Sequence, residues 1–471
     1  IAGVTRFSGG DRSDSDGVNV STEREATTTG SVPVYGREKA VYGLSNRFLH
    51  SEDLNQASTF AAYNSIIHKE MPEISRLGIK MPESPIRKLA PLANEAKARG
   101  IKVYHLNIGQ PDIPTPEVGL EALRRIDQKV LSYCPSDGLP SLRQKMAEYY
   151  GRFAIEVTPD EIFITTGASE ALTLVFLACL DPGDEILIPE PAYANYMSMA
   201  MSCGAVVKTV LSSIDNGFAL PPIEAFEEAI TPRTKAVLLC NPNNPTGYVY
   251  TREELGHIRD LVRRHDLFLF SDEVYREFRY TDAPYVSSFH LEGIEPNVVM
   301  FDSMSKRYSE CGIRVGAIVT RNARVRKSVM KWAQARLSPP LLGQIVAEAS
   351  IDAPESYLKG VYEEYIQRRD FLVKRINEIP GCYSPLPMGA FYTVAKLPVD
   401  DADKFCAWCL RDFSYEGQTV MMAPASGFYV TPGYGRNEVR IAYVLERDEL
   451  ARALDVLEAA LTTYRDRWNK R

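Results

Sequence analysis

Short apolar runs alternate with longer segments of helical character through the middle of the chain. The runs cover 161–164, 185–188, 205–207, 235–240, 267–270, 298–301 and 315–319. Runs of this length, separated by helical stretches, are typical of buried strands joined by crossover helices. The pattern therefore predicts an α/β domain with a mostly parallel, doubly wound sheet.

Beyond this region the pattern changes to longer helices and fewer strands. A helical stretch at 343–375 is followed by segments at 389–392, 402–414 and 438–443, the middle one amphipathic. We expect 341–471 to form the C-terminal part of a smaller α+β domain and 71–125 its N-terminal part. The large domain then covers 126–340.

The first 70 residues differ in composition. Residues 1–32 are rich in Ser, Thr, Gly and Asp, so they cannot offset the entropy cost of ordering and are expected to form a disordered tail. Aromatic residues return at 33–70, which favours an arm that docks on the rest of the protein. Residues 1–70 contain seven Lys or Arg and nine Asp or Glu, a balance that argues against a DNA-binding module.

Overall charge narrows the class of function. The 471 residues carry 54 Lys or Arg and 61 Asp or Glu, a net charge of −7, which provides no basic surface for nucleic acid or an anionic membrane. The eight cysteines are too sparse for a disulfide framework, and no apolar run reaches the ~18 residues of a membrane helix. We therefore expect a cytoplasmic protein that acts on small molecules, without membrane or nucleic-acid partners.

Polar segments follow five of the predicted strands. They are 165–169, 189–193, 241–247, 271–275 and 302–306. Ligands of open α/β sheets bind beyond the carboxyl ends of the strands, so these segments are expected to meet at one site.

Several groups in these segments suit a phosphate. Gly167, Ala168 and Ser169 open a predicted helix and offer free backbone N–H groups and a hydroxyl to an anion. Further donors are Ser303, Ser305 and Arg314. The sequence contains no GxxxxGK(S/T) motif and no GxGxxG that opens a helix, which disfavours a nucleoside triphosphate or a dinucleotide.

Lys306 and Asp272 indicate chemistry at an aldehyde. Lys306 stands beside the phosphate donors at a strand end, where its amine can form a Schiff base. Asp272 follows an apolar strand and would be costly to bury without a cationic partner. A protonated pyridine nitrogen is such a partner, and this pairing of lysine and acid is used by proteins that bind pyridoxal phosphate.

Each residue also has an ordinary structural interpretation. Asp272 could cap a helix, Asn244 could serve in a turn before Pro245, and Tyr193 could simply pack in the core. A separate explanation of this kind for the polar segment after each of the five strands is less economical than one shared site. Cys406 and Cys409 have the spacing of core positions on an amphipathic helix, and none of the six histidines lies in a metal-type cluster, so we expect no metal.

Three motifs carry a resemblance to a known family. SxSKxxxxxGxRxG at 303–316, NPxNPTG at 241–247 and SDExY at 271–275 resemble the class I/II aminotransferases of pyridoxal-phosphate fold type I, the aspartate aminotransferase family. The N-terminal signatures of this family are matched at 85–87, 106–112 and 132–138. The resemblance covers about 72–465 and implies pyridoxal 5′-phosphate as cofactor.

The resemblance also implies a role for individual residues. Lys306 would bind the cofactor and move the proton, Asp272 would keep the pyridine nitrogen protonated, and Asn244 and Tyr275 would bond the phenolic oxygen. Tyr193 would stack on the ring. The phosphate would be held by Ala168, Ser169, Ser303, Ser305 and Arg314, with Tyr133 supplied by the second subunit of a homodimer. Ala168 departs from the glycine that many members carry but leaves its N–H available.

Substrate contacts are implied in the same way. Arg440 would grip the α-carboxylate of the substrate with its two-pronged guanidinium, opposite the backbone of Gly109. Arg336, which lies just before the rigid Pro339-Pro340, could reach the substrate side chain.

These observations favour an aminotransferase that moves an amino group between an L-amino acid and a 2-oxo acid. An alternative is a related enzyme of specialised metabolism that uses the same Schiff base for β/γ-elimination, replacement, cyclisation or carbon–carbon bond formation, which the extension 1–70 keeps open. A third class, a DNA-binding regulator with an aminotransferase-like domain, is disfavoured because 1–70 is acidic.

Overall fold

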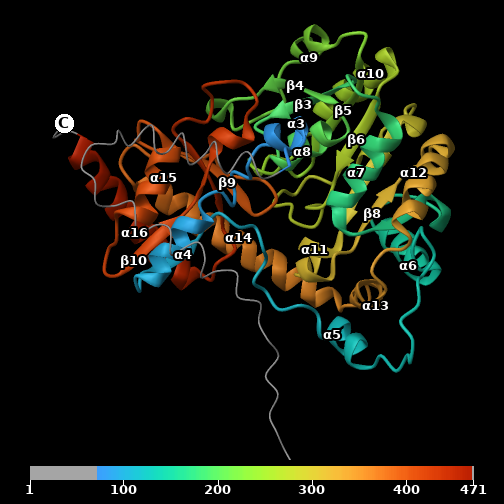
Figure 1. Cartoon of the computed structure of the whole chain (residues 1–471), viewed down its shortest axis with the longest axis horizontal. Helices are drawn as coiled ribbons and strands as arrows, with labels where there is room; N and C mark the ends of the chain where they lie inside the picture. Colours follow the sequence, from blue (N-terminus) through green and yellow to red (C-terminus); the bar gives the residue numbers. More distant parts are fainter. Residues whose placement is uncertain (1–71, 469–471) are drawn as a thin grey trace, which may run out of the picture. The chain divides into compact units, whose positions relative to one another are not determined.

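A seven-stranded sheet forms the centre of this computed structural model, which describes residues 72–468 (Figure 1). Its strands lie in the order β2 (Ile162–Thr165), β8 (Gly316–Val319), β7 (Val298–Ser303), β6 (Phe268–Asp272), β5 (Thr234–Cys240), β3 (Glu185–Glu190) and β4 (Val206–Leu211). All seven apolar runs are therefore strands of one sheet, with ends shifted by a few residues. The predicted tail 1–32 and arm 33–70 lie outside the described residues.

The sheet is mostly parallel, as predicted, and β8 is the exception. β3 through β7 pair in parallel, whereas β8 runs antiparallel to both β7 and β2. The connection from β7 to β8 contains only the four-residue helix α11 (Met304–Arg307) and a single 3₁₀ turn (Cys311–Ile313). A parallel neighbour would need a longer crossover connection, so the chain returns beside β7 in the opposite direction.

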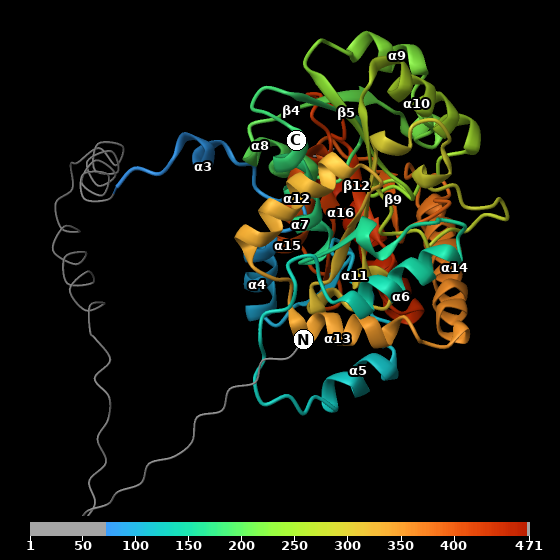
Figure 2. The ribbon, with the colours of Figure 1, turned by 90° about the vertical axis from the view of Figure 1, so that its right-hand side faces the viewer.

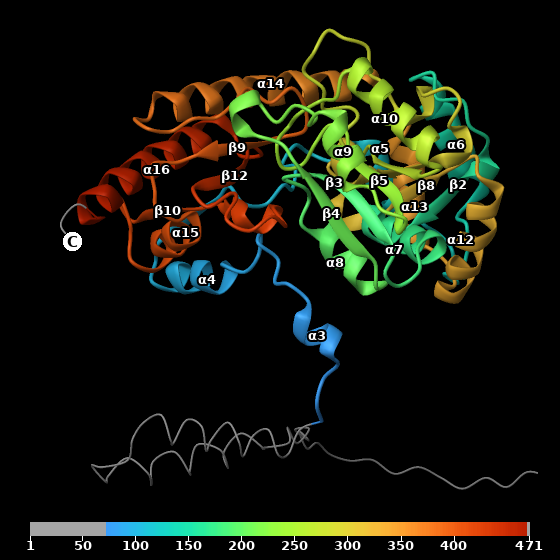
Figure 3. The same ribbon diagram turned by 90° about the horizontal axis from the view of Figure 1, so that it is seen from above.

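Helices cover both faces of the sheet because alternate strand residues point to opposite sides (Figure 3). On β5, Val237 and Leu239 pack with α10 (Arg252–His265), whereas Leu238 joins the cluster that includes α7 (Gly167–Cys179). The α10 helix begins at a capping box in which Thr251 and Glu254 bond each other's backbone. Neighbouring helices are α6 (Pro140–Gly151), α8 (Asn195–Ser202), α9 (Ile223–Ala229), α12 (Ala323–Arg336) and α13 (Leu341–Ser350).

Two smaller sheets lie outside the central one. β9 (Tyr392–Lys396), β12 (Glu438–Ala442) and β11 (Ala423–Pro424) form an antiparallel sheet, and β1 (Lys102–His105) pairs in parallel with β10 (Gln418–Met421). The β1–β10 pair joins the segment before the central sheet to the segment after it. The surrounding helices are α3 (Arg76–Lys80), α4 (Ala90–Ala98), α14 (Glu355–Glu378), α15 (Ala402–Arg411) and α16 (Arg447–Trp468).

The helical stretch predicted at 343–375 is two helices, which corrects the prediction. α13 ends at Ser350 and α14 begins at Glu355, directly after Pro354. Proline restricts the residue before it to extended backbone and cannot donate the hydrogen bond that a continuous helix needs. Cys406 and Cys409 are fully buried on α15, as core positions would be. No helix within 72–468 is both long and apolar enough to cross a membrane.

The helices α13 and α5 (Glu117–Arg124) lie side by side (Figure 2). The carboxyl group of Glu310, in the segment after α11, is buried against both. Glu310 is 2% exposed and accepts a hydrogen bond from Ser350 at the end of α13. A side chain at Gly119 of α5 would meet the Ser350 hydroxyl at 2.2 Å, so only glycine permits this approach. Burial raises the pKa of Glu310 to about 8.

Glu310 should make the stability of the protein depend on pH. Its pKa in the folded state lies above the unfolded value, so its contribution is fully present below about pH 4 and is lost as the pH rises through 8. Relative to Glu310→Gln, the wild type should lose about 1.4 kcal/mol of unfolding free energy per pH unit between about pH 5 and 8. Urea unfolding of both proteins at pH 5 and pH 8 measures this, and a pH-independent difference would contradict it.

Candidate active site

A cavity of about 660 Å³ lies at the carboxyl ends of the central strands and brings together residues from all five polar segments. The predicted site residues on its lining are Gly109, Ala168, Ser169, Tyr193, Asn244, Asp272, Tyr275, Ser303, Ser305, Lys306, Arg314 and Arg440. Because parallel strands end at the same edge of a sheet, residues more than a hundred positions apart meet here.

One side of the cavity is a cup of hydrogen-bond donors at the start of α7. Gly167 has φ +73, and a side chain there would meet the Arg314 guanidinium at 2.3 Å, so glycine lets the arginine lie over the helix start. Arg314 itself adopts the left-handed conformation, with φ 56. A non-glycine residue in this conformation is strained and is typical of functional sites. Arg314 donates to Ser305 Oγ at 3.4 Å, and Ser303 Oγ donates to the same hydroxyl at 2.9 Å.

Lys306 projects into the middle of the cavity from α11. Its Nζ donates to the carbonyl oxygen of Gly109 at 2.8 Å and lies 3.7 Å from Cys311 Sγ. Position 109 requires glycine, because a side chain there would overlap the Tyr392 hydroxyl. Ser303 caps the start of this helix, and its hydroxyl accepts from the Ser305 backbone N–H at 3.1 Å.

The far end of the cavity holds a buried carboxylate without a cationic partner. Asp272 is 4% exposed, accepts from Tyr196 Oη at 2.6 Å and from the Val274 backbone N–H at 3.3 Å. Among the described residues no lysine or arginine compensates its charge, and burial raises its pKa to about 6. A cationic N–H supplied by a ligand would supply the missing charge.

A chain of hydrogen bonds crosses the opposite wall. Asn244 Nδ2 donates to Tyr275 Oη at 3.4 Å, which lies 3.0 Å from Tyr392 Oη, and Arg440 Nη1 donates to Asn244 Oδ1 at 3.1 Å. Arg440 is 1% exposed, also donates to the Asn107 carbonyl, and lies 4.5 Å over the Tyr392 ring. Burial lowers the pKa of Arg440, and its Nε has no hydrogen-bond partner. Arg440 also lines the cavity, so its positive charge can attract an anionic group of a ligand there.

These groups fit a phosphorylated aldehyde that carries a basic ring nitrogen. The donor cup suits the phosphate, the Lys306 amine lies near the centre for the aldehyde, and the uncompensated Asp272 suits a ring N–H. The cationic guanidinium of Arg440, which lines the same cavity, suits the carboxylate of a second molecule. Within residues 72–468 no cluster of histidine, cysteine and carboxylate side chains could hold a metal ion.

Three predicted residues lie outside this lining. Gly167 contributes through its backbone beneath Arg314. Tyr133 is 78% exposed and does not reach the cavity of its own chain. Arg336 donates to the Ser136 carbonyl at 3.0 Å and lies 3.6 Å from Glu170, so a single chain does not bring it to the site.

Other residues of the site were missed by sequence reasoning. Tyr196, Tyr392 and Arg87 all face the cavity. Tyr196 lies in the first turn of α8, three residues after Tyr193, which precedes that helix; the two rings pack edge to face with centroids 5.3 Å apart. Arg87 belongs to a quoted signature, at 85–87, but nothing in the sequence places that signature at the cavity. Tyr392 ends the apolar segment 389–392, so the sequence pattern indicates a core residue rather than a site residue.

Comparison with known proteins gives a consistent assignment. A family model described as aminotransferase class I and II matches residues 101–457. An aspartate aminotransferase of Thermotoga maritima is 33% identical over 390 residues, which cover 82% of this chain and 99% of that protein. The structure of an aspartate aminotransferase from Thermus thermophilus with maleate has a TM-score of 0.76 at 30% identity, and an alanine aminotransferase from Pyrococcus furiosus one of 0.75 at 31%. Each match covers 83% of this chain and the whole of the compared chain.

The uncompensated charge of Asp272 should destabilise the ligand-free protein above pH 6. Its raised pKa means that its contribution is fully present below about pH 4 and is lost as the pH rises through 6. Asp272→Asn keeps the hydrogen bond from Tyr196 and removes the charge, so at pH 8 the ligand-free variant should be more stable by up to about 3 kcal/mol. At pH 4 the difference should vanish. Chemical unfolding at both pH values measures it.

Asp302→Asn provides the matched control. Asp302 is another fully buried aspartate, but Arg307 and Arg276 surround it and hold its pKa below the usual range. The same substitution there should destabilise the protein at pH 8. Loss of stability in both variants would contradict the assignment of Asp272 as an unpaired charge.

Proposed function

The chain belongs to the class I and II aminotransferases, and on that premise we propose that it transfers an amino group between an L-amino acid and a 2-oxo acid with pyridoxal 5′-phosphate bound through Lys306. The observation that carries this proposal is that the Lys306 amine, a cationic donor cup and a buried, uncompensated Asp272 line one cavity. When bound, the cofactor supplies an aldehyde and an electron-withdrawing ring that acidifies the Cα–H of an attached amino acid.

The protein holds this cofactor at both ends. Ser169, Ser303, Ser305 and Arg314, with the backbone N–H groups at the start of α7, bind the phosphate. At the other end Asp272 holds the proton on the ring nitrogen, since a buried carboxylate gains most from a cationic N–H. Tyr196 orients that carboxylate by donating to Oδ2.

The remaining polar groups orient the ring and move the proton. Asn244 and Tyr275, already 3.4 Å apart, hold the phenolic oxygen, and Tyr193 covers the face of the ring. The Lys306 amine is the one primary amine on the cavity lining, so it would take the proton from the substrate Cα and return it to the former aldehyde carbon, on the other side of the amino nitrogen. Burial of these groups excludes water from the step.

Arg440 binds the α-carboxylate of the substrate. Its guanidinium is fixed by Asn244 and by the Asn107 carbonyl and retains an unpartnered Nε. This rigid, planar cation suits two-pronged recognition of a carboxylate. The matched relatives carry aminotransferase names, which supports amino-group transfer over the other carbanion chemistries.

The substrate side chain is proposed to be acidic. Arg87 lies on the cavity lining, and among the described residues its side chain has neither a hydrogen-bond nor an ion-pair partner. Its side-chain cation can hold a second carboxylate, and the polar side chains of Gln110 and Asn195 line the same cavity. The names of two relatives, aspartate aminotransferases of Thermotoga maritima and Geobacillus stearothermophilus, support this choice.

We also propose a homodimer. Val130, Leu131 and Tyr133 are 73%, 54% and 78% exposed, an apolar surface that a second copy would cover. Such a partner would bring its Tyr133 to the phosphate cup.

We further propose that the chain divides into a large domain at 126–340 and a small domain formed by 71–125 and 341–471. The β1–β10 pair, which joins the two parts of the small domain, supports this division.

Lys306→Ala should abolish the covalent link to the cofactor and lower the turnover number by about 10³-fold or more, because no other amine lines the cavity. Borohydride reduction followed by mass spectrometry measures the link, and a stopped-flow half-reaction measures the rate. A reducible link that persists in this variant would place the Schiff base at another lysine.

Arg87→Gln should lower kcat/KM for aspartate and glutamate by about 10- to 100-fold, the value of one lost charge-assisted bond. The value for alanine should change little, because alanine has no second carboxylate. Arg324→Gln, at an exposed arginine outside the cavity, serves as the control. Equal losses for aspartate and alanine would show that Arg87 does not select an acidic side chain.

A further inference from the structure

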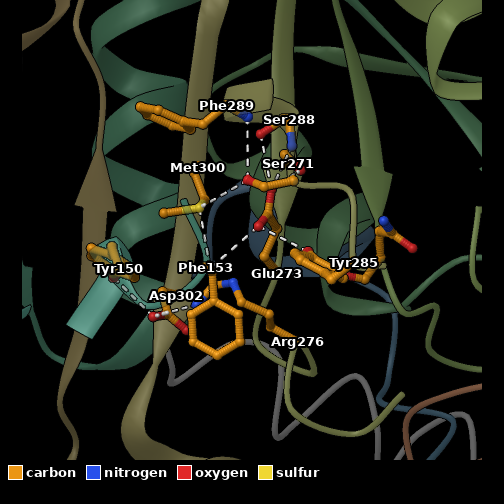
Figure 4. A network of polar contacts seen from close by, with 12 residues as sticks. Tyr150, Phe153, Ser271, Glu273, Arg276, Tyr285, Ser288, Phe289, Met300 and Asp302 are labelled. Carbon is orange, nitrogen blue, oxygen red and sulfur yellow. Dashed lines mark hydrogen bonds and ion pairs between the residues drawn. The ribbon is translucent and has the colours of Figure 1, made fainter. Parts of the chain in front are cut away.

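Behind the cavity lies a cluster of buried charges that the proposed chemistry does not use. Its members are Glu273, Arg276, Glu277, Asp302 and Arg307, with side chains at most 9% exposed. Figure 4 shows Arg276 between Glu273 and Asp302. Tyr149, Tyr150, Tyr285 and the serines at 271, 287 and 288 donate hydrogen bonds to the acids. These hydroxyls stabilise the carboxylates away from water.

Each of four cluster members is the chain neighbour of a residue on the cavity lining. Glu273 follows Asp272, Arg276 follows Tyr275, Asp302 precedes Ser303, and Arg307 follows Lys306. Arg307 Nη2 donates to both oxygens of Asp302, at 2.8 and 2.7 Å, and its Nε lies 2.9 Å from Glu277 Oε1.

The pair between Asp302 and Arg307 closes a loop that contains Lys306. Only residues 303–306 lie between the two charges, and they include the first three residues of α11. A helix of four residues is too short to be stable by its own hydrogen bonds. The bond that closes its last turn, from the Tyr308 N–H to the Met304 carbonyl, is 3.3 Å long. Side-chain anchors must therefore hold α11 in place.

We propose that the Asp302–Arg307 ion pair is a positioning device that holds the Lys306 amine where it can move the substrate proton. Asp302 also accepts the Ser303 backbone N–H at 2.8 Å, so the pair fixes both ends of the Lys306 loop. Arg307 is fully buried and does not line the cavity, so any effect of it on catalysis acts through its neighbour Lys306. This inference rests on the proposed role of Lys306 as the proton carrier.

A double-mutant cycle tests the inference with pyridoxal-phosphate-loaded protein. Four proteins are compared: wild type, Arg307→Lys, Lys306→Ala and the double variant, with methylamine added to the last two as a diffusing base. Lysine keeps the charge but cannot reach Asp302 and Glu277 together. Arg307→Lys should lower kcat for aspartate about 10- to 100-fold with KM little changed, as expected when a reacting group is misplaced. In the Lys306→Ala background, the same substitution should cost nothing further.

The outcomes separate this inference from the proposed function. Equal losses in both backgrounds, a change in KM alone, or full kcat in folded Arg307→Lys would overturn the positioning role. Undiminished activity of Lys306→Ala without methylamine would instead overturn the role of Lys306. If Arg307→Lys does not fold, it is replaced in the cycle by the double substitution Asp302→Asn with Arg307→Met. This substitution removes the ion pair without leaving either partner charged and unpaired.

Glu185→Gln is the matched control for general loss of stability. Glu185 is 1% exposed and accepts bonds from Thr231 and Arg233, but it begins β3 at the end of the sheet away from the cavity. Its loss should lower the unfolding midpoint and leave kcat unchanged. A loss of kcat equal to that of Arg307→Lys would show that destabilisation alone explains the effect and would reject the proposal.

Discussion

The buried charges under the carboxyl ends of β6 and β7 are the constraint on which the site depends. Burying an ion costs several kcal/mol, and removing one partner of a buried pair costs about 3–5 kcal/mol. Asp302, with two arginines and a tyrosine around it, can be satisfied in essentially one arrangement of β6, β7 and α11. Those elements carry Asp272, Ser303 and Lys306, so satisfying the charges behind the cavity also sets the geometry inside it.

The front of the same elements is organised in the opposite way. Asp272 has hydroxyl and backbone donors but no cation, and Arg440 keeps an unpartnered Nε. Unpaired polar groups in a buried wall lower the stability of the ligand-free protein. The same missing partners favour the binding of ligands that supply them. A layer of paired buried charges thus supports a wall in which the Asp272 carboxylate has no cationic partner, and ligand recognition depends on that missing partner.

The fold and much of the site could be predicted from the sequence because the signals are local. Each apolar run became a strand, and polar segments after five of them reached one cavity, since strand direction alone sends their ends to a common edge. The orientation of β8 and the break before α14 were not predicted. Both depend on a connection, a short helix in one case and Pro354 in the other, whose effect an apolar pattern does not show.

What the sequence by itself determined is the family, the kind of sheet and the chemistry of residues that follow strands, because these are encoded in short motifs and periodicity. Only the tertiary structure decided which side chains without a motif enter the site. Tyr196 reaches Asp272 across 76 positions, and Arg307 pairs with Asp302 although a lysine–arginine dipeptide reads as a solvated loop. Pairing partners of this kind depend on burial and on distances between elements, and neither is a property of a local stretch of chain.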